Sequence, residues 1–162
     1  MPKIDIYSEE VLDRVHSLRY ILILAKDVIG ILNRITSLMR RNRYNMEEVS
    51  VSFDQQGKAH ILIAIDGRSY DVNHAMAQLR KLYDVYDVKD VTHEHERLFN
   101  VIYVEVGSAD QFKLFPLPPG RTVKLEQGLC GIFVISLEQT NSLLQFLQEE
   151  GYAYRRRLMG LI

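Results

Sequence analysis

The strongest constraint on the fold is the order in which strand and helix patterns alternate along residues 19–91. Arg19 to Lys26 is a nearly continuous apolar run, which is typical of a buried central strand. From Ile31 the apolar residues change to the spacing of one helical face. The predicted elements are, in order, a strand at 19–26, a helix at 31–41, strands at 46–53 and 58–66, a helix at 71–82 and a strand at 84–91. This is the order of the ferredoxin-like split βαβ fold.

The same order begins again at Leu98, with one element shortened. The patterns predict strands at 98–106, 121–127, 130–137 and 152–162, a helix at 140–150 and at most two helical turns within 108–115. The sequence therefore predicts an α+β protein of two ferredoxin-like βαββαβ units, the second with a shortened first helix. The predicted boundaries are an N-terminal arm at 1–18, a first domain at 19–92, a hinge at 93–97 and a second domain at 98–162. Units of this size have marginal cores, so we expect a homodimer or higher oligomer.

Composition and charge exclude several classes of partner. Lysine and arginine total 20 against 21 acidic residues, and a net charge of −1 provides no general attraction to nucleic acid or anionic lipid. The longest apolar runs, such as Ile61 to Ile65, are far too short to span a membrane. The first ten residues lack the segments of a signal peptide, and the single cysteine, Cys130, permits no intramolecular disulfide. We expect a cytoplasmic protein that binds neither nucleic acid nor membrane.

No motif for catalysis or for a cofactor is present. The phosphate loop GxxxxGK[ST], the dinucleotide fingerprint GxGxxG, the zinc motif HExxH and the pair CxxC are all absent. Acidic residues fall on predicted turns and solvent-facing positions, and Cys130 lies within an apolar strand, where a thiol is usually inert. The sequence therefore predicts no catalytic residue, no cofactor and no enzymatic activity.

Two short charged segments each have a functional and a structural interpretation. His93 and His95 share one face of an extended strand and can hold a metal if His60 or His74 supplies a third ligand; otherwise the segment is a hydrated hinge. Residues 155–157 are three arginines, which can bind a phosphate or another anion, or can protect a terminal strand from aggregation. The structural interpretation is favoured for both segments, and the residues alone leave both alternatives open.

The most informative stretch runs from Leu24 to Asn45. A predicted buried strand ends at Lys26, Asp27 follows, and Gly30 opens the helix. The free N–H groups at a helix start attract a carboxylate, and glycine lets a small ligand approach the backbone. Asp27 can accept hydrogen bonds from an ammonium group, and Asn45 can both donate and accept. These receptors suit a free amino acid; the alternative is an ordinary strand–helix turn with a capping aspartate.

The same stretch resembles a known family. AKDVIGILNRITSLMRRNRYNMEEVSVS is similar to the opening of an ACT domain, and most similar to the regulatory (small) subunit of acetohydroxyacid synthase, also called acetolactate synthase. The likeness rests on Gly30, on Asn33-Arg34-Ile35 at the helix start and on Tyr44-Asn45-Met46-Glu47 at the strand entry. LRKLYDVYDVKDV resembles the second helix and fourth strand of that family, and the chain from Arg97 onward resembles the entry into its C-terminal domain.

The resemblance implies a protein without an active site of its own. It implies a homodimer that binds and activates a separate thiamine-diphosphate-dependent catalytic subunit of acetolactate synthase, with feedback inhibition by valine or a related branched-chain amino acid. By family position, Asn45 would reach the effector site across a dimer interface. The other residues implied to line that site are Asp27, Ile29, Gly30, Ile31 and Leu32. The alternative is a stand-alone amino-acid-sensing ACT protein with a different partner.

The chain departs from the family pattern at three places. Asp27 replaces the usual asparagine, and its carboxylate would repel a carboxylate that approached from that side. Arg43 replaces the helix-ending glycine, so Asn42 or Arg43 must adopt the left-handed conformation. Between Gly107 and Gly128 the long second-domain helix and the T-P-x-S-[LY] signature of the family are missing.

Overall fold

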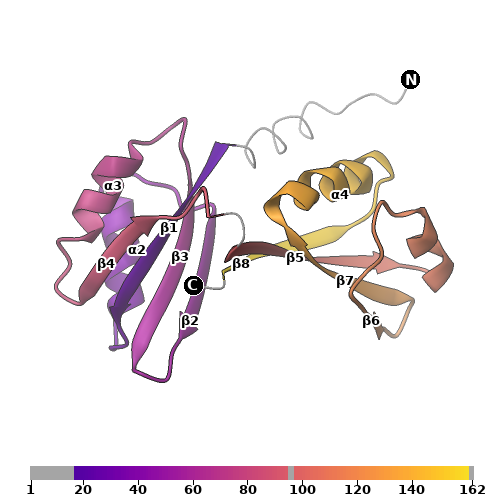
Figure 1. Ribbon diagram of the computed structural model, residues 1–162, viewed down its shortest axis with the longest axis horizontal. Coiled ribbons are helices and arrows are strands. Elements are labelled where there is room, and N and C mark those ends of the chain that lie inside the picture. Colours follow the sequence, from indigo (N-terminus) through magenta and orange to yellow (C-terminus); the bar gives the residue numbers. More distant parts are fainter. Residues whose placement is uncertain (1–16, 95–96, 161–162) are drawn as a thin grey trace. The chain divides into compact units, whose positions relative to one another are not determined.

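Two four-stranded sheets form the framework of the structure. The computed structural model describes residues 17–94 and 97–160, which form two compact units that are divided in the sequence after Glu94. Each unit has one antiparallel sheet with its α-helices packed on one face (Figure 1). The predicted α+β class with two ferredoxin-like units is confirmed.

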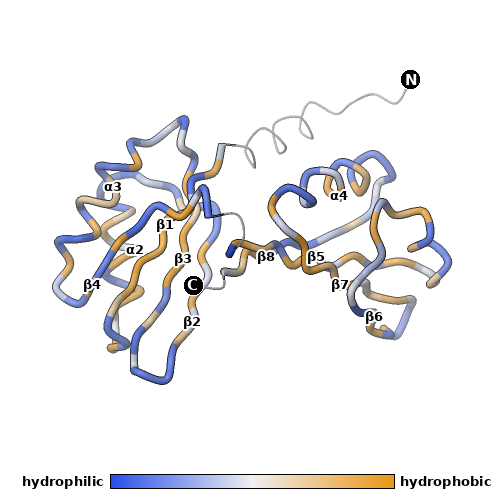
Figure 2. Tube along the Cα trace, in the orientation of Figure 1, coloured by the Kyte–Doolittle hydropathy of each residue, from blue (hydrophilic) through white to orange (hydrophobic). Residues whose placement is uncertain are grey.

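The first unit has the order of elements predicted from the periodicity. Its elements are β1 (Leu18–Lys26), α2 (Ile31–Arg41), β2 (Glu48–Phe53), β3 (Lys58–Asp66), α3 (Val72–Leu79) and β4 (Val85–Asp90). β1 lies inside the sheet, in the spatial order β2-β3-β1-β4, which explains why most of its side chains are buried. The apolar character of β1 and β3 is visible along both strands in Figure 2.

A single apolar core joins the helices of the first unit to its sheet. The buried side chains of α2 are those of the predicted apolar stripe, Ile31, Ile35, Leu38 and Met39. They belong to the same core as Ile21 and Ile23 of β1 and Leu79 of α3. Burial of this stripe fixes the direction in which α2 leaves β1, and so positions the loop at residues 27–30.

Helix α2 ends without the glycine that usually follows a helix. Arg43 has a φ of 59° and, among the described residues, is the only one other than glycine with a positive φ. The amide of Tyr44 donates to the carbonyl of Met39 at 2.9 Å, which closes the last turn. The expectation that Asn42 or Arg43 takes the left-handed conformation is confirmed at Arg43.

The second unit repeats the order with a reduced first helix. Its elements are β5 (Leu98–Val106), the 3₁₀ helix η2 (Ala109–Leu114), β6 (Arg121–Lys124), β7 (Leu129–Ser136), α4 (Leu137–Glu149) and β8 (Tyr154–Gly160), in the sheet order β6-β7-β5-β8. Aromatic rings pack beside the short η2: Phe115 stacks on Phe133 with ring centroids 5.8 Å apart, and Phe112 meets Phe133 edge-on. A buried hydrogen bond of 2.9 Å from the Asn100 amide to Thr140 Oγ1 fastens α4 to β5.

Two helix boundaries differ from the predictions by three residues. Helix α3 ends at Leu79 instead of 82, because the chain then enters tight turns in which the amide of Leu82 donates to the carbonyl of Leu79 at 3.1 Å. Helix α4 begins at Leu137 instead of 140, because the Ser136 hydroxyl accepts a hydrogen bond from the amide of Gln139 at 3.3 Å. Strand β6 ends at Lys124 instead of 127, and strand β8 begins at Tyr154 instead of 152.

Parts of two predicted segments fall on residues that the structure does not describe. The N-terminal arm at 1–18 lies outside the described residues up to position 16, and the hinge at 93–97 does so at 95–96. In 17–94 and 97–160, no helix combines the length and the apolar character needed to cross a membrane.

Candidate functional site

The loop between β1 and α2, together with the first turn of α2, contains five of the six residues predicted to line an effector site. Ile29 is fully exposed, and Leu32 in the first turn of α2 is 41% exposed, whereas Ile31 is buried in the core. Asp27 and Gly30 are also exposed. The loop therefore presents two aliphatic side chains and one carboxylate around an accessible glycine.

The start of α2 has backbone N–H groups that a ligand can reach. No side chain caps the helix, and Gly30 has a φ of 87°, a conformation that favours glycine. The amide of Ile31 donates to the carbonyl of Val28 at 3.1 Å, but the amides of Leu32 and Asn33 have no acceptor among the described residues. A Cβ at Gly30 would meet nothing within 4 Å, so the backbone is open to approach.

Asp27 does not cap α2. Its amide donates to the carbonyl of Gly57 at 3.1 Å, which ties the loop to the β2–β3 hairpin. Its carboxylate makes no hydrogen bond or ion pair with any described residue. The interpretation of this segment as a turn with a capping aspartate is therefore wrong, and the carboxylate is available to a cationic group.

Asn45 lies at the opposite end of α2 from the loop. The helix has 11 residues, which corresponds to about 16 Å of length. The strand register agrees, because Glu48 at the start of β2 pairs with Ala64, which pairs with Tyr20 near the beginning of β1. The side chain of Asn45 donates to Glu47 Oε1 at 3.0 Å. One copy of the chain does not bring Asn45 to the loop.

The ion pair between Arg34 and Asp84, which the sequence did not predict, lies beside the end of the loop at which α2 begins. Arg34 in the first turn of α2 contacts Asp84 at 2.5 Å between Nη2 and Oδ2. The amide of Lys26 at the end of β1 donates to the carbonyl of Asp84 at 2.8 Å. Asp84 therefore fixes both ends of the loop. The sequence places Arg34 on the solvent side of α2, and no local signal connects it with a residue 50 positions later.

The stretch that builds this site matches a known family. Residues 21–87 match a family model described as an AHAS small subunit-like ACT domain. These residues form such an ACT domain. The predicted resemblance is confirmed over this part of the chain, which includes the loop at 27–30, α2, Asn45 and Asp84.

Curated relatives of the ACT domain are named as small subunits of acetolactate synthase. The chain is 32% identical over 89 residues to acetolactate synthase small subunit 1, chloroplastic, of Nicotiana plumbaginifolia. It is 30% identical over 83 residues to the acetolactate synthase small subunit of Bacillus subtilis. These matches cover 53% and 49% of this chain, and 20% and 48% of the relatives. The chain thus matches less than half the length of these relatives.

A solved structure extends the likeness beyond the ACT domain. The crystal structure of the acetolactate synthase small subunit from Thermotoga maritima aligns with a TM-score of 0.67, covering 90% of this chain and 98% of its own. The two sequences are 14% identical, so this likeness shows a shared fold. The fold similarity therefore includes the second unit as well as the ACT domain.

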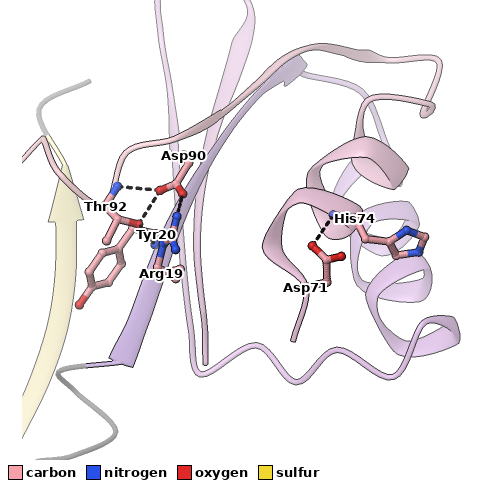
Figure 3. A network of polar contacts seen from close by, with 6 residues as sticks. All are labelled: Arg19, Tyr20, Asp71, His74, Asp90 and Thr92. Atoms are coloured by element: carbon pink, nitrogen blue, oxygen red, sulfur yellow. Dashed lines mark hydrogen bonds and ion pairs between the residues drawn. The ribbon is translucent and has the colours of Figure 1, made fainter. Parts of the chain in front are cut away.

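A second polar cluster joins β4 to β1 in the ACT domain. Figure 3 shows Arg19 paired with Asp90, and Thr92 donating to Asp90 from its amide and its hydroxyl. Thr92 Oγ1 also accepts a hydrogen bond of 2.9 Å from the amide of Tyr20. Burial raises the pKa of Asp90, but the hydrogen bonds from Thr92 and Arg19 outweigh it and hold that pKa below its usual value. Because these polar groups are hydrogen-bonded to one another, we assign the cluster a structural role.

The described residues contain no group of three metal-ligating side chains. His93 is exposed in a turn after β4, and His95 lies outside the described residues. Of the two candidates for a third ligand, His60 contacts Asp54 Oδ2 through Nε2 at 3.1 Å, and His74 lies on α3 (Figure 3). A metal site at His93 and His95 stays a prediction.

Proposed function

We propose that this chain is a non-catalytic regulatory subunit of acetolactate synthase. In this proposal it binds a branched-chain amino acid resembling valine and modulates a thiamine-diphosphate-dependent catalytic subunit. The observation that carries the proposal is the open start of α2 in an ACT domain, where the amides of Leu32 and Asn33 lie in the same loop region as the carboxylate of Asp27. The two curated relatives reported above, which are named as acetolactate synthase small subunits, support the choice of partner.

An α-amino acid fits these groups in one orientation. Its carboxylate accepts hydrogen bonds from the amides of Leu32 and Asn33, where the dipole of α2 adds partial positive charge. Its ammonium group faces Asp27, which keeps the two carboxylates apart. Ile29 and Leu32 then contact an aliphatic side chain, and each buried methylene adds about 0.8 kcal/mol. This orientation also explains how an aspartate is tolerated where the family usually has asparagine.

In this proposal the effector site is complete only when two copies meet. β2 is an edge strand, and Val49 and Phe53 on it are 43% and 62% exposed. If two copies pair antiparallel along β2 about a two-fold axis, the start of one β2 lies beside the end of the other. Asn45 of the second copy then approaches the β2–β3 hairpin, to which Asp27 is tied through Gly57. Such pairing supplies the asparagine that a single copy does not.

A thermal-shift experiment tests the effector site. We expect valine or isoleucine to raise Tm, because a ligand that binds only the folded state stabilises it. We expect Gly30→Asp to abolish the shift, since the new carboxylate occupies the space beside the open amides. Gly151→Asp is the matched control, because its φ is also positive and a Cβ there also meets nothing within 4 Å. No shift with any of the twenty amino acids, or an equal loss in both variants, contradicts the proposal.

A second experiment tests the partner. The catalytic subunit from the same organism is assayed for acetolactate formation with and without the full chain. We expect the chain to raise the rate, and valine to lower it only when the chain is present. A thermal shift with valine combined with no effect on the catalytic subunit would instead favour a stand-alone amino-acid-sensing protein with a different partner.

A further inference from the structure

A hollow of about 370 Å³ lies on the second sheet, among strands β5, β7 and β8. It belongs to the face that α4 leaves open. Asn100 of β5 bonds to Thr140 of α4, and residues at odd positions of β5 point to the opposite face because side chains alternate along a strand. The lining residues used below are Tyr103, Glu105, Cys130, Arg155 and Arg157.

Arg155 and Arg157 give the hollow its positive charge. They pair with Tyr103 and Val101 across the β5–β8 ladder, and two residues apart on one strand they share a face about 7 Å apart. Both side chains are exposed, and neither makes a hydrogen bond or ion pair with any described residue. Arg156 between them is half-buried, as the alternation requires. Two guanidinium groups without a partner among the described residues therefore share one face of the sheet.

Protection of an edge strand explains only part of this arrangement. β8 is an edge strand, and charges along an edge discourage aggregation. That role needs charge, but it needs neither a hollow nor polar groups from the next strand. The Tyr103 hydroxyl and the Glu105 carboxylate of β5 line the same hollow, and they too have no partner among the described residues. Two cations, a hydroxyl donor and one acceptor therefore line a single hollow.

We propose that this hollow binds a small organic anion through one carboxylate or phosphate group held by Arg155 and Arg157. Guanidinium groups recognise both kinds of anion through paired N–H donors. The Tyr103 hydroxyl donates to the same group, and Glu105 accepts from a hydroxyl or ammonium group elsewhere on the ligand. Glu105 also disfavours ligands with several negative charges, because its carboxylate repels a second anionic group. The site lies outside the ACT domain and does not depend on the effector proposed above.

The single cysteine of the chain is a reporter for this site. Cys130 lines the same hollow, so a bound anion should slow its alkylation by the neutral reagent iodoacetamide, which mass spectrometry measures. In the full chain we expect phosphate at millimolar concentration to protect Cys130, and sodium chloride at equal ionic strength to give no protection. A parallel titration with acetate shows whether the preferred group is a carboxylate or a phosphate. No protection by either anion, or equal protection by chloride, overturns the proposal.

Charge-neutral variants test the two arginines. We expect Arg155→Gln combined with Arg157→Gln to abolish protection. The same variant should lower the ratio of alkylation rates with iodoacetate and iodoacetamide about threefold, because the anionic reagent is no longer attracted. The matched control, Lys113→Gln with Lys124→Gln, removes two exposed positive charges from η2 and β6 and should change neither result, because Lys124 points away from the face that Cys130 shares with Val123, and η2 packs through Phe112 on that opposite face. An equal loss in the control means that only net charge matters and overturns the proposal.

Discussion

At the scale of single residues, Gly128 is a position where a side chain does not fit. Its φ is +88°, and a Cβ there would overlap the carbonyl oxygen of Val106. Gly128→Ala therefore adds a steric clash with the backbone to conformational strain. We expect it to lower the free energy of unfolding by about 3 kcal/mol, measured by urea denaturation.

Gly57→Ala is the matched comparison for that substitution. Gly57 also has a positive φ, of +72°, but a Cβ there meets nothing within 4 Å. Strain alone then costs about 1 kcal/mol. If both variants lost the same stability, the predicted overlap at Gly128 would have no energetic effect.

Some features of single residues could be predicted from the sequence, and others could not. A glycine or polar residue directly after an apolar run is a local signal, which is why the open loop at Gly30 and the left-handed end of α2 at Arg43 could be predicted. The buried pair of Asn100 and Thr140 could not, because a contact between residues 40 positions apart leaves no periodic pattern. The same holds for the ion pair that fixes the loop from Asp84.

At the scale of elements, the start of α4 depends on Ser136. Its hydroxyl accepts a hydrogen bond from the amide of Gln139, and the Gln139 side chain bonds back to the amide of Ser136. We expect Ser136→Ala to lower the free energy of unfolding by about 1 kcal/mol. Ser142→Ala on the exposed surface of the same helix should raise it by about 0.3 kcal/mol, because alanine favours helix. Urea denaturation that gave the same sign for both variants would rule out a role of the cap.

The turn between β3 and α3 is organised by Asp66. Its carboxylate accepts hydrogen bonds of 2.9 Å from the amide of Arg68 and from the hydroxyl of Ser69. The bond from Arg68 is the main cause that lowers the pKa of Asp66 from 3.8 to about 2, against the opposing effect of burial. Because the folded-state pKa lies below the unfolded-state value, the ionised carboxylate adds stability that is fully present above pH 3.8 and is lost as the pH falls through about 2.

We therefore expect Asp66→Asn to be less stable than the wild type near neutral pH, and the difference to disappear as the pH falls through about 2. Urea denaturation over a pH series measures it. Ser69→Ala removes one hydrogen bond and should raise the pKa of Asp66, which an NMR titration of the carboxyl carbon follows. A stability difference that does not change with pH would contradict this explanation.

The order of the elements follows from the sequence more directly than their ends do. A strand or a helix packs into a layer through one apolar face. Its apolar residues therefore recur with the period of that element, and this period can be read from the sequence. The start of α4 had a local signal that the prediction of residue 140 did not use, because Ser136 and Gln139 have the spacing of a capping box. The end of α3 was not, since Leu82 continues the helical spacing after the backbone has begun to turn towards Val85, which pairs with Ala25.

At the scale of the whole molecule, the proposed effector site combines residues that one chain holds apart. The sequence could predict a loop with residue types that suit an amino acid, because Asp27 and Gly30 follow a buried strand directly. It could not show that Asn45 lies at the far end of α2, since that depends on the register of β2 against β3. The family resemblance, and no pattern within the chain, implied that the asparagine comes from a second copy.

An interface along β2 can be tested by placing a charge on that edge. We expect the full chain to sediment as a dimer or larger, and Val49→Lys to shift it towards monomer and weaken the response to valine, because lysine on an edge strand opposes pairing. Val123→Lys is the matched control on β6, the edge of the other sheet, where the side chain is 39% exposed against 43% for Val49. Sedimentation velocity distinguishes the outcomes. A monomeric wild type, or dissociation by Val123→Lys but not by Val49→Lys, would mean that Asn45 of a second copy does not reach the loop through β2.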